Sequence, residues 1–127
     1  MKHINSLLVI IIVIFLMSCD KDKDETGKVT FYTNAQAVVN CGPFDVEVYI
    51  NNSLTGIIKE PFFPLNSTPE CNSHNSDTML VTEILEGSYE FTARITCSET
   101  SNYIGNFKVK KDSCSLVFID LLNTYSE

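Results

Sequence analysis

The alternation of apolar and polar residues between positions 89 and 97 constrains the fold more than any other feature of the chain. The apolar positions are Tyr89, Phe91, Ala93, Ile95 and Cys97. The positions between them are Glu90, Thr92, Arg94 and Thr96. Because successive side chains of a strand point to opposite faces, this pattern predicts a half-buried antiparallel strand with one face toward a core.

Six further segments carry strand signals, at 28–33, 45–50, 55–58, 78–85, 103–110 and 114–122. Turn residues separate them, such as Asn51-Asn52-Ser53 and Glu86-Gly87, and no segment has convincing helical periodicity. The segment 114–122 is apolar on both faces, which predicts a central strand. Seven short strands favour an all-β fold, a small antiparallel β-sandwich over residues 28–122.

The N-terminal segment predicts export. Leu7 to Met17 is an unbroken apolar run, which suits the hydrophobic region of a signal peptide and is too short to span a bilayer as a helix. Leu16-Met17-Ser18-Cys19 resembles a bacterial lipobox. That resemblance implies removal of residues 1–18 and attachment of lipid to Cys19, which would anchor the protein in a membrane. The alternative is an ordinary signal peptide in which Cys19 is incidental.

Residues 19–27 are expected to form the lipidated start and a charged tether. The acidic run after Cys19 is similar to the surface-export signal of some Gram-negative lipoproteins. Asp20, directly after the cysteine, resembles instead the signal that retains lipoproteins in the inner membrane of enteric bacteria, which leaves the periplasmic side open. The expected address is therefore the outer membrane, with the cell surface and the periplasmic face both open. With a formal charge of −7 and only one arginine, Arg94, the chain is a poor ligand for nucleic acid.

Four cysteines remain once Cys19 is assigned to lipid: Cys41, Cys71, Cys97 and Cys114. An even number in an exported domain predicts two disulfides, with three possible connectivities. Counting strands up and down places Cys71 and Cys97 at one end, so we expect the pairs Cys71–Cys97 and Cys41–Cys114. The spacings suit neither a redox pair nor a structural zinc site, and no metal or cofactor is expected.

The segment Lys59–Asp77 is the longest one without strand signals, and it contains three prolines. Phe62 and Phe63 lie between two of them, and adjacent side chains of an extended chain cannot both point inward. We therefore take Phe62, Phe63 and Leu65 as a candidate binding loop. The alternative is that one of the two phenylalanines caps an open edge of the core.

Catalytic chemistry has little support. His3 leaves with the signal peptide and His74 is expected to be a solvated loop residue, so no nucleophile with a histidine base can be assembled. The protein is not expected to be an enzyme. Asp77-Thr78-Met79 resembles an O-glycosylation motif of some Gram-negative bacteria, which makes Thr78 a candidate glycan site.

Leu85-Glu86-Gly87-Ser88-Tyr89 resembles the L-x-G-x-Y hairpin of PEGA-like and transthyretin-like sandwich domains. The order of the other segments, from Val29 to Cys114, is similar to that of uncharacterised lipoproteins that carry such domains. The resemblance implies a fold and a compartment and brings no catalytic residue. The expected function is a non-catalytic binding or adhesion module for a protein or glycan. The alternatives are a hydrolase inhibitor that uses the Pro61–Leu65 loop and a structural envelope subunit.

Overall fold

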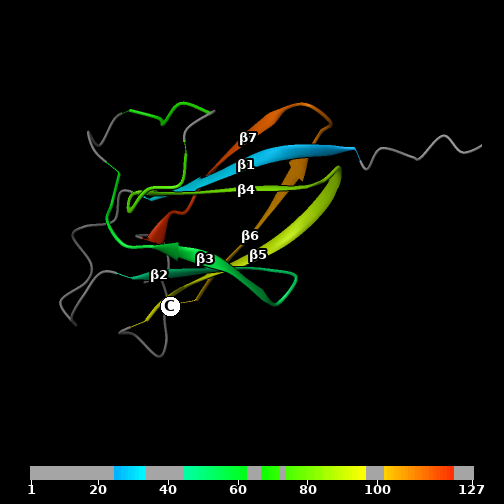
Figure 1. Cartoon of the computed structure of the whole chain (residues 1–127). Coiled ribbons are helices and arrows are strands. Elements are labelled where there is room, and N and C mark those ends of the chain that lie inside the picture. The colour runs from blue at the N-terminus through cyan, green and yellow to red at the C-terminus, as the bar shows by residue number, and fades with distance from the viewer. Residues whose placement is uncertain (1–24, 34–44, 63–66, 72–73, 97–101, 122–127) are drawn as a thin grey trace, which may run out of the picture.

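A computed structural model describes residues 25–33, 45–62, 67–71, 74–96 and 102–121 (Figure 1). The strands are β1 (Thr26–Tyr32), β2 (Val46–Ile50), β3 (Ser53–Ile58), β4 (Met79–Leu85), β5 (Gly87–Ile95), β6 (Asn102–Val109) and β7 (Cys114–Phe118). These bounds confirm all seven predicted strands, and no α-helix occurs in the described ranges. The expectation of an all-β protein is therefore confirmed. None of these residues forms a helix that could cross a membrane.

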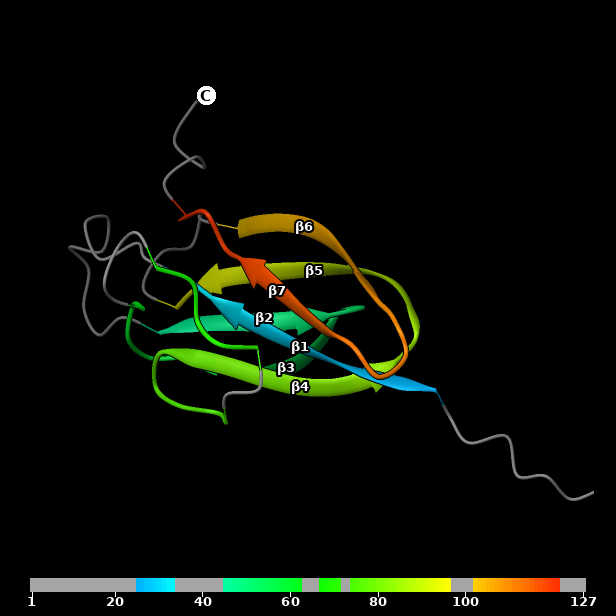
Figure 2. The same cartoon turned by 90° about the horizontal axis from the view of Figure 1, so that it is seen from above.

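The strands form two sheets, one with the order β4-β1-β7 and one with the order β3-β2-β5-β6 (Figures 1 and 2). All neighbouring strands are antiparallel except β1 and β7, which pair in parallel with Tyr32 opposite Phe118. The expectation of purely antiparallel sheets is therefore wrong for this pair. Parallel neighbours need a long connection, and here the whole chain between the first and last strands supplies it.

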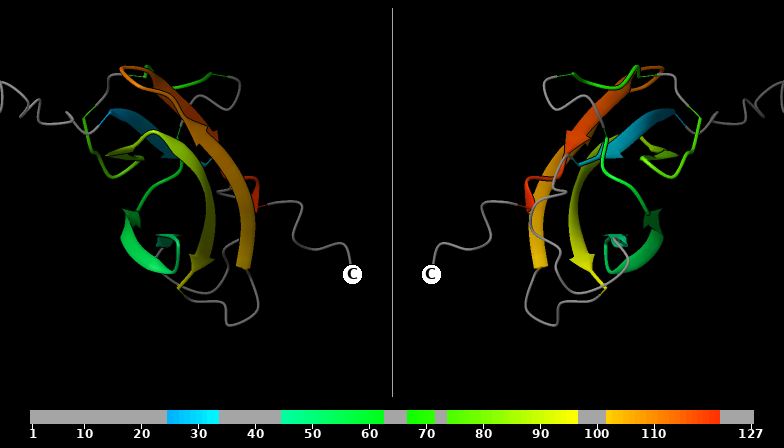
Figure 3. Two further views of the ribbon diagram at one scale, coloured as in Figure 1. Left: turned by 90° about the vertical axis from the view of Figure 1, so that its right-hand side faces the viewer. Right: turned by 90° about the vertical axis from the view of Figure 1, so that its left-hand side faces the viewer.

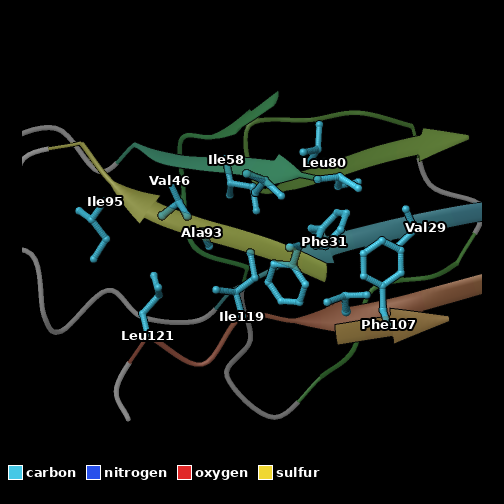
Figure 4. Close-up of a cluster of buried hydrophobic side chains, with 14 of the residues drawn as sticks. Val29, Phe31, Val46, Ile58, Leu80, Ala93, Ile95, Phe107, Ile119 and Leu121 are labelled. Atoms are coloured by element: carbon cyan, nitrogen blue, oxygen red, sulfur yellow. The ribbon is translucent and has the colours of Figure 1, made fainter. Parts of the chain in front are cut away.

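One core fills the space between the two sheets (Figure 4). Phe31 of β1 is fully buried, and its ring centroid lies 5.3 Å from those of both Phe91 and Phe107 in the larger sheet. The other core residues are Val29, Val46, Val48, Ile50, Ile58, Leu80, Ala93, Ile95, Val109, Val117, Ile119 and Leu121. Because burial of each large apolar side chain contributes roughly 1.5–3 kcal/mol, this shared core explains why the two sheets stay together.

The predicted turn after β2 is confirmed as a hairpin. Asn51 and Asn52 adopt φ values of 50° and 65°. Two consecutive residues with positive φ define the type I′ turn, whose twist matches that of the strands it joins. Asparagine tolerates this left-handed conformation better than most residues, so the Asn51-Asn52 pair fixes the β2–β3 register.

The expected hairpin at Glu86-Gly87 is wrong, because this turn carries the chain from one sheet to the other. β4 belongs to the smaller sheet and β5 to the larger one. The Tyr89 hydroxyl donates a hydrogen bond to the Leu85 carbonyl oxygen at 2.9 Å, and the Glu86 N–H donates to the Glu25 carbonyl oxygen at 2.7 Å. These bonds stabilise a corner at which the chain passes from one sheet to the other. The same sequence pattern, an apolar residue followed by a glycine turn and a tyrosine, is compatible with such a corner and with a hairpin.

β7 is an edge strand and ends at Phe118, so the prediction of a central strand over 114–122 is wrong. Val117 faces the core, whereas Leu116 and Phe118 are 40% and 38% exposed. Leu116 and Phe118 share the outer face of the sheet with Thr30 and Tyr32, where the Phe118 ring lies 5.3 Å from the Tyr32 ring, and both also line a groove described below. Ile119 and Leu121 remain buried after the strand has ended.

The folded part also begins earlier than residue 28. β1 starts at Thr26, whose carbonyl oxygen accepts a hydrogen bond from the Asp112 N–H at 2.9 Å. The Glu25 carboxylate accepts a hydrogen bond from Lys111 Nζ at 2.7 Å. The last residues of the predicted tether, 25–27, thus belong to the folded part.

Candidate binding groove between β6 and β7

The predicted binding loop does not project from the body where the structure describes it. The Phe62 N–H donates a hydrogen bond to the Thr33 carbonyl oxygen at 2.7 Å, and the half-buried Phe62 ring lies 5.9 Å from the Tyr32 ring. This geometry agrees with the alternative in which one phenylalanine caps the body of the protein. Phe63 and Leu65 lie outside the described residues.

The described residues 67–71 lie over the outer face of the smaller sheet (Figure 1). The backbone N–H groups of Lys59 and Glu60 both donate to the Asp77 carbonyl oxygen at 2.8 Å. Pro69 is buried, and Cys71 is bonded to Cys114 at the start of β7. The segment therefore works as a strap that covers this face, which explains why Thr30 and Tyr32 on β1 are buried.

The disulfide Cys71–Cys114 has a Cα–Cα distance of 5.7 Å and overturns both predicted pairs, Cys71–Cys97 and Cys41–Cys114. Counting strands failed because Cys71 lies in the connection between β3 and β4, which places it beside the start of β7 and not at a strand end. Cys41 and Cys97 lie outside the described residues.

Two other predicted positions are described. Thr78 is half-buried in the turn between Ser76 and Met79, with its hydroxyl oxygen 3.0 Å from that of Ser76, and a glycan there stays a prediction. His74 is exposed. No cluster of potential metal ligands occurs in the described part of the chain.

An open groove of about 520 Å³ lies between β6 and β7, where an edge of the larger sheet faces an edge of the smaller one. Its lining combines aromatic and aliphatic side chains with polar groups, and polar atoms make up the larger part of the exposed lining surface. The lining residues come from both strands and from β5: Phe91, Tyr103, Gly105, Asn106, Phe107, Lys108, Ser115, Leu116, Val117 and Phe118. Lys108 is the one charged residue among them. The groove thus carries a positive charge in a chain whose formal charge is −7.

The two sides of the sheet pair differ, which explains the groove. On the β3–β4 side, Leu80 packs directly against the backbone of Gly56 and closes the space between the sheets. On the β6–β7 side, the Ser115 hydroxyl donates to the Lys108 carbonyl oxygen at 2.7 Å and joins the strands at one point. Figure 3 shows β6 curving toward β7 at this end. Beyond that point the side chains of the two strands line the groove.

Gly105 exposes the groove floor. A Cβ atom at this position would lie 2.6 Å from an edge carbon of Phe91, so only glycine lets the ring sit under β6. The Phe91 ring also lies 5.8 Å from Tyr103 and 6.0 Å from Phe107, and Phe107 stacks on Tyr89 at 5.5 Å. Rings that contact one another in this way form a floor of fixed shape.

Backbone groups of both strands point into the groove. The Lys108 carbonyl oxygen points to β7, and alternate residues of a strand share a direction, so the N–H and C=O groups of Ile104 and Asn106 point the same way. In β7, the Ser113 carbonyl and the Ile119 N–H bond to β1, which leaves the groups of Leu116 and Phe118 facing the groove. Within the described ranges, no backbone group forms a hydrogen bond with the N–H and C=O groups of Ile104 and Asn106 that point into the groove.

A polar cluster occupies the outer face of the larger sheet. The Glu47 carboxylate accepts hydrogen bonds from the Tyr49 hydroxyl at 2.6 Å and from Arg94 Nη2 at 2.6 Å. These bonds, with the Tyr49 bond the larger effect, lower the pKa of Glu47, and the Glu47 bond raises the pKa of both Tyr49 and Arg94. Each polar group already has a partner within the cluster, which makes it a cross-strand stabilising unit.

Sequence reasoning missed the groove, although one signal pointed to it. A glycine between Tyr103 and Phe107 on the inward face of an alternating strand marks a place where a ring or another chain approaches the backbone. This signal was not enough to predict the groove, because nothing in the sequence shows that the edge of β6 lies beside the edge of β7. Comparison with protein-family models, curated proteins and solved structures finds no match to this chain. The likeness to PEGA-like and transthyretin-like domains therefore stays a prediction.

Proposed function

We propose that the chain is a membrane-anchored bacterial lipoprotein whose folded part, a small β-sandwich, is a non-catalytic binding or adhesion module outside the cytoplasm. Lipid on Cys19 anchors it in the outer membrane. The apolar run Leu7–Met17 and the lipobox-like Leu16-Met17-Ser18-Cys19 support this address. The disulfide between Cys71 and Cys114 fits an oxidising compartment.

The groove between β6 and β7 carries the proposal for binding. It combines aromatic side chains with strand edges whose backbone groups point inward, and clefts that bind polypeptides by strand addition have the same two features. We prefer the groove to the Pro61–Leu65 loop as the binding site, because the Phe62 ring already packs against Tyr32. An inhibitor that inserts this loop into a hydrolase cleft has correspondingly less support.

The position of the groove relative to the anchor also suits capture of a ligand. The tether enters β1 at Thr26, whereas Phe118 lies beside Tyr32 at the other end of that strand. Six residue steps of about 3.3 Å separate these ends by roughly 20 Å. The Phe118 end of the groove is therefore remote from the tether and accessible to molecules away from the membrane.

Photocrosslinking in the native envelope tests this function. A photoreactive phenylalanine analogue replaces Leu116, which lines the groove and is 40% exposed. The matched control places the same analogue at Leu85, an exposed leucine of the same sheet that does not line the groove. We expect irradiation of the full-length lipoprotein to give a discrete adduct from position 116 and none from position 85. Equal labelling at both positions, or no adduct at either, would contradict the proposal.

Protease shaving of intact cells distinguishes the two faces of the outer membrane. Loss of the domain while periplasmic controls stay intact would place it on the cell surface and favour adhesion or ligand capture. Protection would place it on the periplasmic face, where a structural envelope subunit becomes the better description.

A further inference from the structure

We infer that the groove takes an extended polypeptide segment, apolar on one face and carrying an acidic group, which adds as a strand to the free edge of β6. This inference rests on the proposed binding function and names the class of ligand. The ligand's backbone bonds to the β6 edge, and its alternate side chains lie in the groove against the aromatic floor and against β7.

The backbone geometry favours a strand over a compact ligand. Ile104 and Asn106 each present an N–H and a C=O group toward the groove. That row of alternating donors and acceptors matches the edge of another extended chain, which is the basis of strand addition. A small compact molecule would leave most of its surface exposed in an open groove, whereas such ligands are normally buried by 70–90% or so.

The end of the groove at Ser115 sets the extent of the bound segment. The Lys108 carbonyl oxygen already accepts a hydrogen bond from the Ser115 hydroxyl, so the backbone of the ligand can begin to pair with β6 only at Asn106. It then runs toward Asn102, the first residue of β6. Alternate side chains of the added strand would meet Phe107 and Tyr103 on the floor, with Leu116 and Phe118 forming the opposite wall.

The charge of the groove lining indicates which charge the bound peptide should carry. Lys108 is exposed at the rim and is the one ionisable group in the lining other than the Tyr103 phenol. No acidic side chain lines the groove, although acidic residues outnumber basic ones in the chain by 16 to 9. An acidic group on the peptide would therefore meet a favourable potential here, and a basic one would not.

The test uses the full lipoprotein in detergent and a synthetic peptide of about nine residues, the length of a long strand. In this peptide valine alternates with threonine, and the central threonine is replaced by glutamate. Affinity is measured by fluorescence anisotropy of the labelled peptide. A second peptide carries lysine in place of the glutamate.

Ile104→Pro is the decisive variant. It removes the N–H that points into the groove and leaves the β5–β6 ladder intact, since proline is tolerated where an edge N–H faces away from the sheet. Ile104→Thr is the matched control, because it also removes the apolar side chain but keeps the N–H. We expect binding to weaken about tenfold or more in Ile104→Pro, since a peptide carbonyl loses its donor, and to change little in Ile104→Thr.

Lys108→Glu is the second variant and does not alter the backbone, so the inference stays testable if Ile104→Pro fails to fold. It should weaken the glutamate peptide and strengthen the lysine peptide by about threefold each, as expected for a rim charge pair. Lys28→Glu, an exposed lysine on β1, serves as the control and should change neither affinity.

The outcomes separate this inference from the proposed function. Binding that weakens about tenfold or more with Ile104→Pro and changes little with Ile104→Thr supports strand addition. Equal binding by both variants, or no binding of either peptide by the wild type, overturns it. If crosslinking at position 116 gives a glycan adduct while the peptides do not bind, the binding module stands and the polypeptide ligand is wrong.

Discussion

At the scale of single residues, Phe31 holds the two sheets together. Its ring belongs to the smaller sheet and contacts Phe91 and Phe107 of the larger one. Phe31→Ala would leave a cavity at the centre of the only core that the described residues share.

We expect this substitution to lower the free energy of unfolding by about 3–5 kcal/mol, as measured by chemical denaturation. Leu54→Ala is the control, because Leu54 is 55% exposed, and it should change stability by no more than about 0.5 kcal/mol. Similar small losses for both variants would contradict the central position assigned to Phe31.

Glu47 gives a prediction about pH. Its folded-state pKa is lowered by the Tyr49 hydrogen bond first and by the Arg94 hydrogen bond second. A carboxyl group with a lowered folded-state pKa adds stability above its unfolded pKa, and that contribution is lost as the pH falls through the folded value.

Tyr49→Phe should therefore raise the pKa of Glu47 toward its ordinary value, as followed by the NMR shift of the carboxyl carbon. Tyr103→Phe, a tyrosine in the groove, should leave it unchanged. An unaltered Glu47 pKa in Tyr49→Phe would show that the phenol does not hold this carboxylate.

At the scale of elements, the β2–β3 turn depends on two asparagines with positive φ. Asn52→Ala should destabilise the protein by about 1 kcal/mol, because a Cβ without a local hydrogen-bonding group disfavours the left-handed region. Asn52→Gly should be neutral or stabilising, since glycine is preferred at the second position of a type I′ turn. Thermal unfolding of the two variants measures the difference, and equal melting temperatures would argue against this turn.

The disulfides belong to the same scale. With Cys71 bonded to Cys114, and with Cys19 assigned to lipid as proposed, we expect Cys41 to pair with Cys97. The register supports this pair, because Val46 lies opposite Ile95 and the Thr96 N–H donates to the Asp45 carbonyl oxygen at 3.0 Å. Asp45 and Thr96, the described residues nearest in sequence to Cys41 and Cys97, therefore lie side by side at the same end of adjacent strands.

Peptide mapping without reduction should give the linked pairs 71–114 and 41–97. The Cys71–Cys114 bond closes a long loop and should stabilise the fold by about 4 kcal/mol on the chain-entropy estimate. Any link between Cys71 and Cys97 would contradict the register and restore the pairing expected from strand counting.

The strands were predictable because alternation is a local signal. In Tyr89–Ile95 and Tyr103–Val109, the alternation of apolar and polar residues shows directly which side chains face the core. Their partners were not predictable, because pairing depends on contacts between distant segments. The parallel β1–β7 pair, the corner at Glu86 and the strap that brings Cys71 to Cys114 are all long-range features.

The surroundings of the candidate loop were not predictable for the same reason. The prolines around Phe62 marked a segment without strand signals, but the packing of Phe62 depends on Tyr32, which is distant in the sequence. The groove needs β6 and β7 from different sheets, and neither strand shows by itself that its edge is free.

At the scale of the whole molecule, the proposed function combines a lipid anchor at Cys19 with a groove whose Phe118 end lies at the far end of β1 from Thr26. The charged residues Asp20 to Asp24 connect Cys19 to the folded part. A domain held in this way can be presented to ligands without contact between its acidic surface and the lipid headgroups.

The account depends most directly on Cys19. Growth of a Gram-negative host that expresses the full chain with an alkyne-tagged fatty acid, followed by mass spectrometry of the N-terminal peptide, tests it. We predict a mature protein that begins at Cys19, carries acyl chains and enters the membrane fraction. Cys19→Ala should be unlabelled and should leave that fraction. A wild-type protein that keeps residues 1–18, or that is cleaved without acquiring lipid, would contradict the account.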